Sequence, residues 1–431
     1  MSDVNDLSAQ MAAINVVAST ELVEKVSDTH DLARLQNKLN ESRNRAETVR
    51  SLLVNTQPHE LTVETANYID NQLSSIGALQ VDGTTVQGVE SLGYTLMPRQ
   101  FLETRLAGCE GFLSSWGAKT TFIAKQIAAA FKDAWVLLRE SNDSLLSRLD
   151  ALDKDIQQAG TFPEGTSEIL IGFRLYNLFQ INHEVKEDWI NQLTKVSKTI
   201  NGLSSNYYVM SKNNLNTTLS YFGGFPKLDE AKATERYLML PASIPSVRFK
   251  ECTIADRTWP QKGIAAFRSV EMMGGRFFMD TRTLDRDLSP KIPEDVNQYL
   301  VGYLENDRTF FNNKPEKEYN DLKETVKTLG SEQIKQIVKL ARTLLKDWEK
   351  VYIDGEKHKL VDKDYEGIMK ELLDAEWNDD LRYYVFNAFN GLVTKNQQEL
   401  IELRAKVNTY LVFLINGIIE ICYTSIELNQ E

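Results

Sequence analysis

The sequence predicts a mainly α-helical protein, in which long amphipathic helices pack as a bundle with a small antiparallel β insertion in the middle (α+β). Three observations indicate this fold class. Apolar residues between 100 and 156 recur at steps of three and four, which places them on one side of a long helix. A second apolar repeat of this kind lies near the C-terminus, between 400 and 426. Short alternating segments bounded by Gly and Pro are confined to residues 236–284.

The composition is that of an ordinary globular chain. Its 431 residues are 42% hydrophobic and 26% charged, and this length predicts roughly two to four structural units. A net charge of −12 argues against non-specific DNA binding by the whole molecule. Cys109, Cys252 and Cys422 lie far apart and have no metal-ligand spacing, so buried thiols are expected. No basic region followed by an apolar core begins the sequence, which favours an intracellular origin.

The first 56 residues are polar and predicted to be helical. Apolar residues there keep a seven-residue rhythm with Ser42 at the missing position: Leu32, Leu35, Leu39, Ala46, Val49 and Leu53. About three heptads make a coiled-coil-like seam that is marginal without a partner. Pro58 ends this helix, and a shorter one is expected over 63–76. Residues 77–88 predict a linker or a weak hairpin with a turn at Asp82-Gly83.

The long helix predicted over residues 100–156 carries a basic repeat. Lys125, Lys132 and Arg139 recur every seven residues, and they are candidates for a strip that faces nucleic acid phosphates. The alternative is that these residues lie on a solvated helix face, and this is the favoured interpretation of the basic repeat. The stretch predicts one long helix or two in line, and the segment Ser141-Asn142-Asp143-Ser144, rich in capping residues, is the favoured place for a break.

The middle of the chain mixes predicted helices and strands. Residues 168–182 are densely apolar and fit either structure, whereas 184–200 has a helical period that ends before Gly223-Gly224. Three short β segments are then expected, and they make one small antiparallel sheet: 236–240, 247–250 and 276–283.

The C-terminal part is predicted to be helical again, with a long run over 365–428. Between Tyr410 and Cys422 nearly every side of the helix is apolar, which indicates burial on two faces. The long helix over 100–156 is the expected partner for that surface. A membrane span is the alternative, but the run is only about 13 residues and contains Asn416 and Glu420, whereas a span needs roughly 20.

Motifs for catalysis or ligand binding are incomplete in this sequence. His183-Glu184 is followed by Glu187 where a zincin helix needs a second histidine. No phosphate-binding loop occurs, and the acidic cluster around Trp377 fits a solvated face. The sequence therefore predicts a non-enzymatic protein with no catalytic, cofactor-binding or metal site and no small-molecule substrate.

The order of the parts is the most informative feature. A charged helical leader of about 90 residues is followed by Gly88-Val89-Glu90-Ser91-Leu92-Gly93-Tyr94, the long helix, a middle containing Leu240-Pro241-Ala242, and C-terminal helices. This layout resembles the internal head proteins and related virion structural proteins of large tailed bacteriophages. The resemblance implies a structural protein packaged inside the phage head. It also implies an N-terminal propeptide that a maturation protease removes by cutting after glutamate.

Cleavage between Glu90 and Ser91 is the processing event that the resemblance favours for this chain. These proteases commonly favour Leu, Ile, Ser or Ala two residues before the glutamate, and Gly88 departs from that pattern. Sequences of the favoured type occur at Leu22-Val23-Glu24 and Leu39-Asn40-Glu41. A chain that starts at Ser91 is expected to keep nearly the full stability, because the short leader seam adds little to the main core.

The resulting domain prediction has four parts. They are a leader and candidate propeptide (1–90), the long helix (91–160), a helical and small-sheet middle (161–300), and C-terminal helices that pack on the long helix (301–431). Expected partners are other virion proteins, the maturation protease and packaged DNA. The expected location is the interior of the head, with host cytoplasm during assembly.

Two other classes of protein remain open. A cytoplasmic helical scaffold or adaptor would bind a host protein and would not enter particles. A membrane-active, pore-forming helical protein would use the apolar run over 410–422 or the helix over 112–138. The shortness of the apolar run and the lack of a secretion signal count against the membrane-active class.

Overall fold

The computed structural model describes residues 35, 38–77, 80–81, 84–85, 98–244, 247–258, 262–284, 290–312, 324–356 and 361–430. Side chains at 121, 124–125, 127–141, 204 and 351–363 lie outside this description. The described chain is mainly α-helical with small antiparallel sheets, which confirms the predicted fold class. It divides into two compact units, one formed by Ser27–Lys132 and one that contains Asp133–Glu431.

The unit Ser27–Lys132 contains a helix over residues 38–55, α2 (Val63–Gly77) and the first part of α3 (Pro98–Ala159). Five positions of the predicted seven-residue stripe are buried, and Leu35 is half-buried. The buried positions are Leu39, Ser42, Ala46, Val49 and Leu53. On α2 the apolar residues Ile69, Leu73 and Ile76 form one buried face, and Ala66 is buried as well. β1 (Gln80–Val81) pairs with β2 (Thr84–Thr85) in antiparallel register, so the hairpin alternative is confirmed over these residues.

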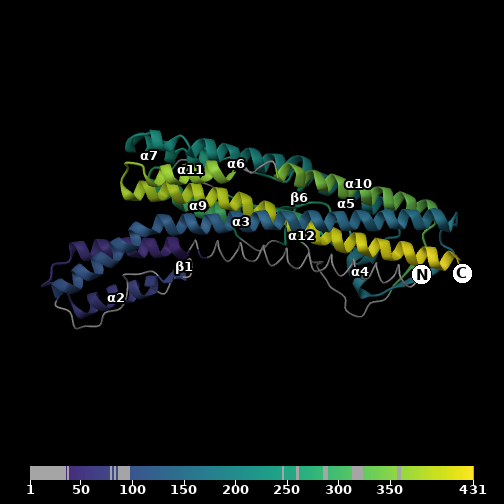
Figure 1. Ribbon diagram of the computed structural model, residues 1–431, viewed down its shortest axis with the longest axis horizontal. Coiled ribbons are helices and arrows are strands. Elements are labelled where there is room, and N and C mark those ends of the chain that lie inside the picture. Colours follow the sequence, from purple (N-terminus) through teal and green to yellow (C-terminus); the bar gives the residue numbers. More distant parts are fainter. Residues whose placement is uncertain are drawn as a thin grey trace. The chain divides into compact units, whose positions relative to one another are not determined.

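The long helix α3 is continuous from Pro98 to Ala159 (Figure 1). Of the two alternatives, one long helix is therefore confirmed, and the helix has no break at Ser141-Asn142-Asp143-Ser144. Capping residues end a helix when their side chains replace backbone hydrogen bonds, but Asn142 is buried and the helical pattern continues through it. One turn further, the Ser147 hydroxyl donates to the Asp143 carbonyl at 3.0 Å, a bond that leaves the helix intact. Burial of Leu145, Leu149 and Leu152 outweighs the local preference for a cap.

The unit that contains Asp133–Glu431 holds most of the elements. Its helices after α3 are α4 (Phe173–Phe179), α5 (Trp189–Gly202), η1 (Leu203–Tyr207), α6 (Tyr208–Phe222), η2 (Phe225–Lys227), α7 (Glu230–Leu238), α8 (Leu240–Ser243), α9 (Pro293–Asn306), α10 (Ser331–Glu356), α11 (Val361–Leu373) and α12 (Asp379–Gln430). The π-helical turn η1 joins α5 and α6 into one continuous helical run. That run ends before Gly223-Gly224, as predicted.

The described strands of this unit form three small antiparallel sheets. The largest has the order β6-β7-β8-β9, with bounds Ile254–Ala255, Ile264–Arg268, Phe277–Thr283 and Arg308–Asn312. β3 (Glu168–Ile171) pairs with β10 (Glu324–Lys327), and β4 (Gln180–Ile181) pairs with β5 (Glu184–Val185). Asn182 and His183 between β4 and β5 have φ values of 51° and 67°, as a two-residue hairpin turn of this kind requires. His183 is therefore a turn residue.

Two of the three predicted β segments are wrong. Residues 236–240 belong to α7 and α8, because Asp229 caps α7 by accepting from the Lys232 amide at 2.9 Å. Pro241 then falls in the first turn of α8, where a missing N–H costs nothing. Residues 247–250 form no strand. The third segment is β8, and its partner β9 lies beyond the region where strands were expected.

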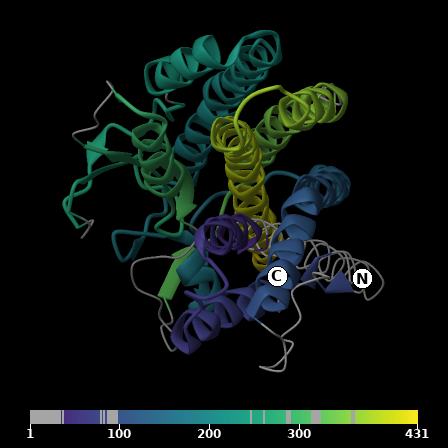
Figure 2. The ribbon, with the colours of Figure 1, turned by 90° about the vertical axis from the view of Figure 1, so that its left-hand side faces the viewer.

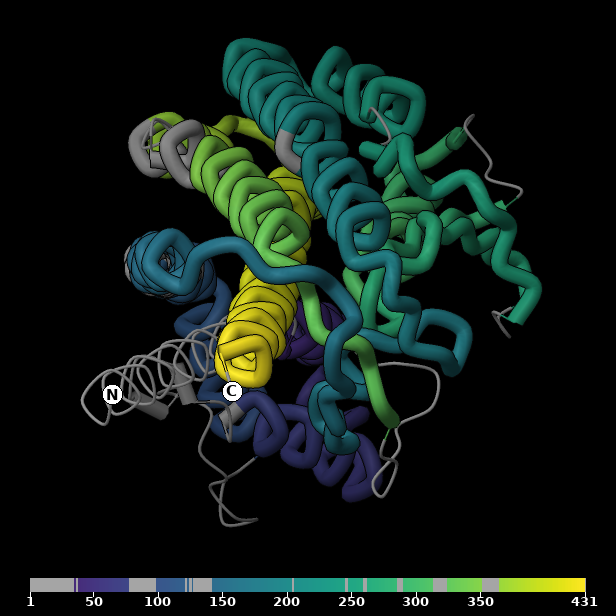
Figure 3. The backbone as a smooth tube through the Cα atoms, turned by 90° about the vertical axis from the view of Figure 1, so that its right-hand side faces the viewer, coloured from purple at the N-terminus to yellow at the C-terminus, as the bar shows by residue number. Residues whose placement is uncertain are grey.

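α12 forms the core of its unit. It packs against α4, α6, α9, α11 and β9, and in the end-on views it (yellow) lies among the teal and green helices (Figure 2), with α10 beside it (Figure 3). Tyr410 donates to the Met273 carbonyl at 3.0 Å, and its ring lies 5.6 Å from that of Phe311. Gly417 lies directly against α4, where an added Cβ would come within 2.6 Å of the end of the Leu178 side chain and force it to shift. Two-sided burial of 410–422 is therefore confirmed, apart from the exposed Phe413 and Glu420.

The membrane-span alternative concerns the same helix. In the described chain α12 alone is long and apolar enough to cross a membrane, and 61% of its most apolar window is buried inside the protein. A core helix passes this test as readily as a span does.

The last part of α3 contacts α12 through polar side chains. Arg148 donates to the Asn416 side chain, and Tyr423 donates to Asp155 at 2.7 Å. Arg342 of α10 adds ion pairs to Asp150 and Asp153 of α3 at 2.8 and 3.1 Å. Packing of the C-terminal helices along the whole of α3 stays a prediction.

Candidate functional site: the leader interface and the polar cluster on α12

The residues singled out from the sequence fall largely outside the described part of the chain. Glu90 and Ser91, the candidate cleavage residues, are not among the described residues. Lys125, Lys132 and Arg139 belong to α3, but their side chains are outside the description. The proposed cleavage and the basic strip therefore stay predictions. The described polar contacts lie between the helices 38–55, α2 and α3, and on α12.

The leader helices, defined as the helix over 38–55 and α2, pack on one face of α3. Three of their contacts to α3 involve arginines. Arg105 of α3 pairs with Asp70 of α2 at 2.8 Å, and the Arg105 side chain is only 3% exposed. Arg43 lies 5.2 Å from the ring centre of Trp116, and Arg50 approaches Glu110 at 3.9 Å. Both leader helices thus contribute to the cover of α3.

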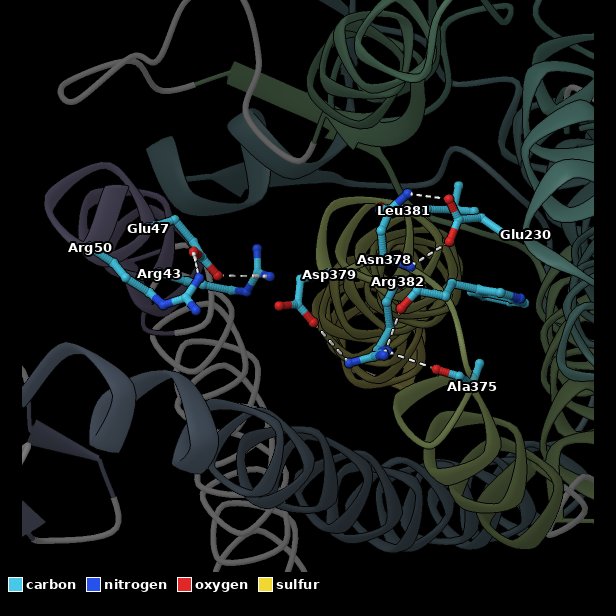
Figure 4. A network of polar contacts seen from close by, with 10 residues as sticks. Arg43, Glu47, Arg50, Glu230, Ala375, Asn378, Asp379, Leu381 and Arg382 are labelled. Atoms are coloured by element: carbon cyan, nitrogen blue, oxygen red, sulfur yellow. Dashed lines mark hydrogen bonds and ion pairs between the residues drawn. The ribbon is translucent and has the colours of Figure 1, made fainter. Parts of the chain in front are cut away.

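Charges within the leader orient these arginines. Glu47 pairs with Arg43 at 3.5 Å and with Arg50 at 3.8 Å, as Figure 4 shows. The two leader helices are joined to each other by Arg45, which donates to the Ser75 hydroxyl at 3.0 Å. Arg43 is itself mostly buried, so its charge adds to the interface by cation–π contact as well as by pairing.

Cys109 lies on the same face of α3 and is fully buried. Burial raises the pKa of its thiol to about 11, and the carboxylates of Glu47 and Glu110 act in the same direction. The thiol therefore stays protonated near neutral pH and is a poor nucleophile. Burial likewise raises the pKa of Cys252 and Cys422, and all three cysteines are free and buried, as predicted.

One alternative cleavage sequence lies in the described leader. Leu39-Asn40-Glu41 is helical, and Leu39 is completely buried. A protease needs an exposed segment of chain that can open into its cleft, so this sequence is protected in the folded leader. Leu22-Val23-Glu24 lies outside the described residues.

A second polar cluster lies on α12, around Glu399. Tyr207 of the π-helical turn donates to Glu399 at 3.2 Å, and the Lys395 ammonium pairs with the same carboxylate at 2.9 Å. Lys395 also donates to the Leu304 carbonyl at 3.2 Å. Burial raises the pKa of Glu399, although Lys395 opposes this rise, and burial raises the pKa of Tyr207 well above its usual value.

This cluster borders a small cavity between α12, α6 and the four-stranded sheet. Its volume is about 20 Å³, which suits about one water molecule. Asp280 of β8 accepts from Thr309 at 2.8 Å and pairs with Arg282 at 2.6 Å. Asp307 accepts from both the amide and the hydroxyl of Thr283 at 2.8 Å. Both carboxylates thus form hydrogen bonds or ion pairs with neighbouring residues of the protein. This geometry is typical of a structural contact between elements of the fold.

The acidic cluster near Trp377 is the N-terminus of α12. Asn378 donates through its backbone and side chain to Glu230 at 2.8 and 2.7 Å, and Arg382 pairs with Asp379 at 3.1 Å (Figure 4). The Trp377 indole donates to the Leu228 carbonyl at 3.0 Å. Acidic residues at a helix start interact favourably with its dipole, so the cluster has a structural explanation. Within the described residues, no three His, Cys, Asp or Glu side chains are grouped to hold a metal ion.

The fold and these clusters define a class: a long-helix bundle protein whose polar groups are engaged in packing its elements together. A model of the phiKZ-like phage internal head proteins matches residues 18–424 of the sequence. The match spans most of the chain, and the chain belongs to this family. It is a structural head protein of a phage, located in the virion head. No curated protein and no solved structure matches the sequence.

Sequence reasoning found the family and the buried stripes but missed both polar clusters. The Asp70–Arg105 pair joins residues 35 positions apart, and nothing local marks either one. Lys395 and Glu399 are spaced like any solvated helical pair, and only the tertiary fold buries them. The π-helical turn that brings in Tyr207 has no sequence signal that periodicity can detect.

Proposed function

We propose that this chain is a non-enzymatic structural protein of the phage head interior, made with a propeptide that is removed by cleavage between Glu90 and Ser91. The observation that carries this proposal is the family match over residues 18–424, which includes most of the leader. The polar groups around Glu399 and Asp280 support a non-enzymatic role, since their partners are other groups of the same fold.

The position of Glu90 supports its choice as the cleavage residue. It falls between β2, which ends at Thr85, and α3, which begins at Pro98. A cut there separates the leader helices from α3 without breaking any described helix. Cleavage after Glu41 would instead require the helix over 38–55 to unfold first.

Other virion proteins are the proposed partners during assembly in the host cytoplasm, together with the maturation protease. Packaged DNA is a further proposed partner through Lys125, Lys132 and Arg139. These three basic residues recur every seven residues in the sequence of α3, which predicts that they share one side of the helix, and cations in such a strip could contact phosphates. DNA binding is the weaker part of the proposal, because the net charge of the chain is −12.

Mass spectrometry of purified particles tests the proposal. We expect peptides from residues 91–431 in the particle and a new N-terminus at Ser91. A phage carrying Glu90→Gln should retain the leader, whereas the matched variant Glu41→Gln should be processed normally. An intact leader in wild-type particles would contradict cleavage. Absence of the protein from particles would favour the adaptor class, and leakage of liposomes would favour the membrane-active class.

A further inference from the structure

The small cavity beside Glu399 is lined by a buried amide oxygen that needs a hydrogen-bond donor. This oxygen belongs to Asn214 of α6, a residue that is only 8% exposed. Within the described part of the chain, no hydrogen bond reaches its Oδ1 atom. A buried acceptor without a donor has lost its hydration and gained nothing in return, so such groups are rare in folded proteins.

The register of α6 on α12 explains why a side chain of α12 does not supply the donor. Polar pairs across this interface run antiparallel: Tyr207 donates to Glu399 at 3.2 Å and Ser211 to Asn396 at 3.0 Å. The next turn of α6 therefore brings Asn214 opposite Leu392, which also lines the cavity. Leucine has no group that can donate, so the amide oxygen faces an apolar side chain and the cavity.

The charged side chains that line the cavity balance one another. Three are acidic and three are basic: Asp280, Asp307 and Glu399, with Arg282, Arg308 and Lys395. Arg282 lies 2.6 Å from the carboxylate of Asp280, and Lys395 lies 2.9 Å from that of Glu399. The lining thus has no net charge that would favour an anion or a metal ion. It suits a small neutral ligand that can both donate and accept hydrogen bonds.

We propose that this cavity is a binding site for one ordered water molecule, which donates to Asn214 Oδ1 and bridges it to the Lys395–Glu399 pair. The volume of about 20 Å³ admits about one water. A buried water needs roughly two to four polar partners, and Asn214, Lys395 and Glu399 supply them. The water replaces a direct contact between α6 and α12 at this turn, and it hydrates the buried ion pair. This inference goes beyond the proposed function and holds whether or not the leader is cleaved.

Crystal structures of the full chain and of three variants, refined with ordered water, test the inference. In the parent we expect one peak of density at about 2.7–3.2 Å from Asn214 Oδ1. Asn214→Leu has a similar volume but no acceptor, so the peak should be lost. The matched control Asn213→Leu changes the neighbouring exposed residue and should keep the peak. Asn214→Ser should also keep a water, because its hydroxyl still accepts a hydrogen bond.

Three results would overturn the inference: a parent cavity without density, a peak with the contacts of about 2.0–2.6 Å that a metal ion makes, or an unmoved water in Asn214→Leu. If Asn214→Leu did not fold, loss of the water from Asn214→Ser would overturn it instead. None of these structures involves phage particles or the cut after Glu90. A failure here is therefore distinct from a failure of the proposed function.

Discussion

Each of the two compact units is stabilised internally by a different kind of contact. In Asp133–Glu431, aromatic rings from distant elements meet in the core, as in the stacked pair Phe222–Phe225 at 5.4 Å and the pair Phe249–Phe278 at 4.5 Å. In Ser27–Lys132, the leader helices contribute aliphatic side chains and arginine contacts, and the one aromatic residue of the described leader, Tyr68, is exposed. The buried aromatic rings among the described residues of that unit, Phe101, Phe112 and Trp116, all belong to α3, so the described leader contributes no ring-on-ring pairs like those of the other unit.

This difference fits a chain whose first part leaves and whose second part stays. In the proposed function, the cut after Glu90 would allow the leader helices to separate from α3, and the contacts of the aromatic core around α12 lie within the other unit.

Replacement of Leu414 by Asp should have the largest effect on the α12 unit. Leu414 is completely buried, so Leu414→Asp places a carboxylate in an apolar core and should cost about 4 kcal/mol or more. Phe413→Asp is the matched control on the next residue, which is 46% exposed, and should cost about 1 kcal/mol or less. Chemical denaturation measures both. Equal losses at 413 and 414 would show that burial of α12 does not set the stability.

Removal of the buried Asp70–Arg105 ion pair should affect the stability of the unit Ser27–Lys132. Asp70→Ala leaves Arg105 without its carboxylate and should destabilise the packing of the leader by about 3 kcal/mol. Glu64→Ala on the exposed side of α2 is the control and should change little. Hydrogen exchange measures the opening of residues 38–77 in each variant. Faster exchange in α12 of the Asp70→Ala variant would contradict the separation of the two units.

Glu399 should give the α12 unit a pH dependence. Because burial raises its pKa, the folded chain binds this proton more tightly than the unfolded chain, whose glutamate pKa is about 4.3. The group therefore contributes its full stabilisation below about pH 4.3 and loses it as pH rises through the folded pKa. Glu399→Gln should remove that decline, whereas Glu427→Gln at an exposed position should not. The urea midpoint of each protein is measured between about pH 4 and pH 7. If the midpoints of the parent and of Glu399→Gln changed with pH in the same way, this prediction would be contradicted.

The basic repeat on α3 should matter least to stability. If Lys132 lies on a solvated face, as its sequence spacing favours, Lys132→Ala should change the free energy of unfolding by only about 0.3 kcal/mol. The triple variant Lys125→Ala, Lys132→Ala, Arg139→Ala should weaken DNA binding at low salt only if the strip faces phosphates. Filter binding at two salt concentrations separates these cases, and a large stability loss in Lys132→Ala would contradict the solvated face.

The parts of the fold that the sequence predicted are those governed by one element's own periodicity. The stripes on α3 and the helix over 38–55, and the all-round apolar run of α12, were readable because each follows from the residues of one helix alone. Elsewhere, tertiary context outweighed local preference. Asn142 is a capping residue held inside a helix, and residues 236–240 have strand propensity but follow a strong cap at Asp229. Long-range pairs such as Asp70–Arg105 carry no local pattern, so the leader interface needed the structure.

Native-state hydrogen exchange on the full chain, over a series of urea concentrations below the unfolding transition, tests the central comparison most directly. If the leader is a separable unit, amides of residues 38–77 should exchange through an opening of lower free energy than the amides of 410–422 in α12. The opening of the leader should also depend less on urea, because it exposes less surface. If both segments exchanged through one common opening with the same free energy and the same urea dependence, the leader would belong to the main fold, and its separability would be contradicted.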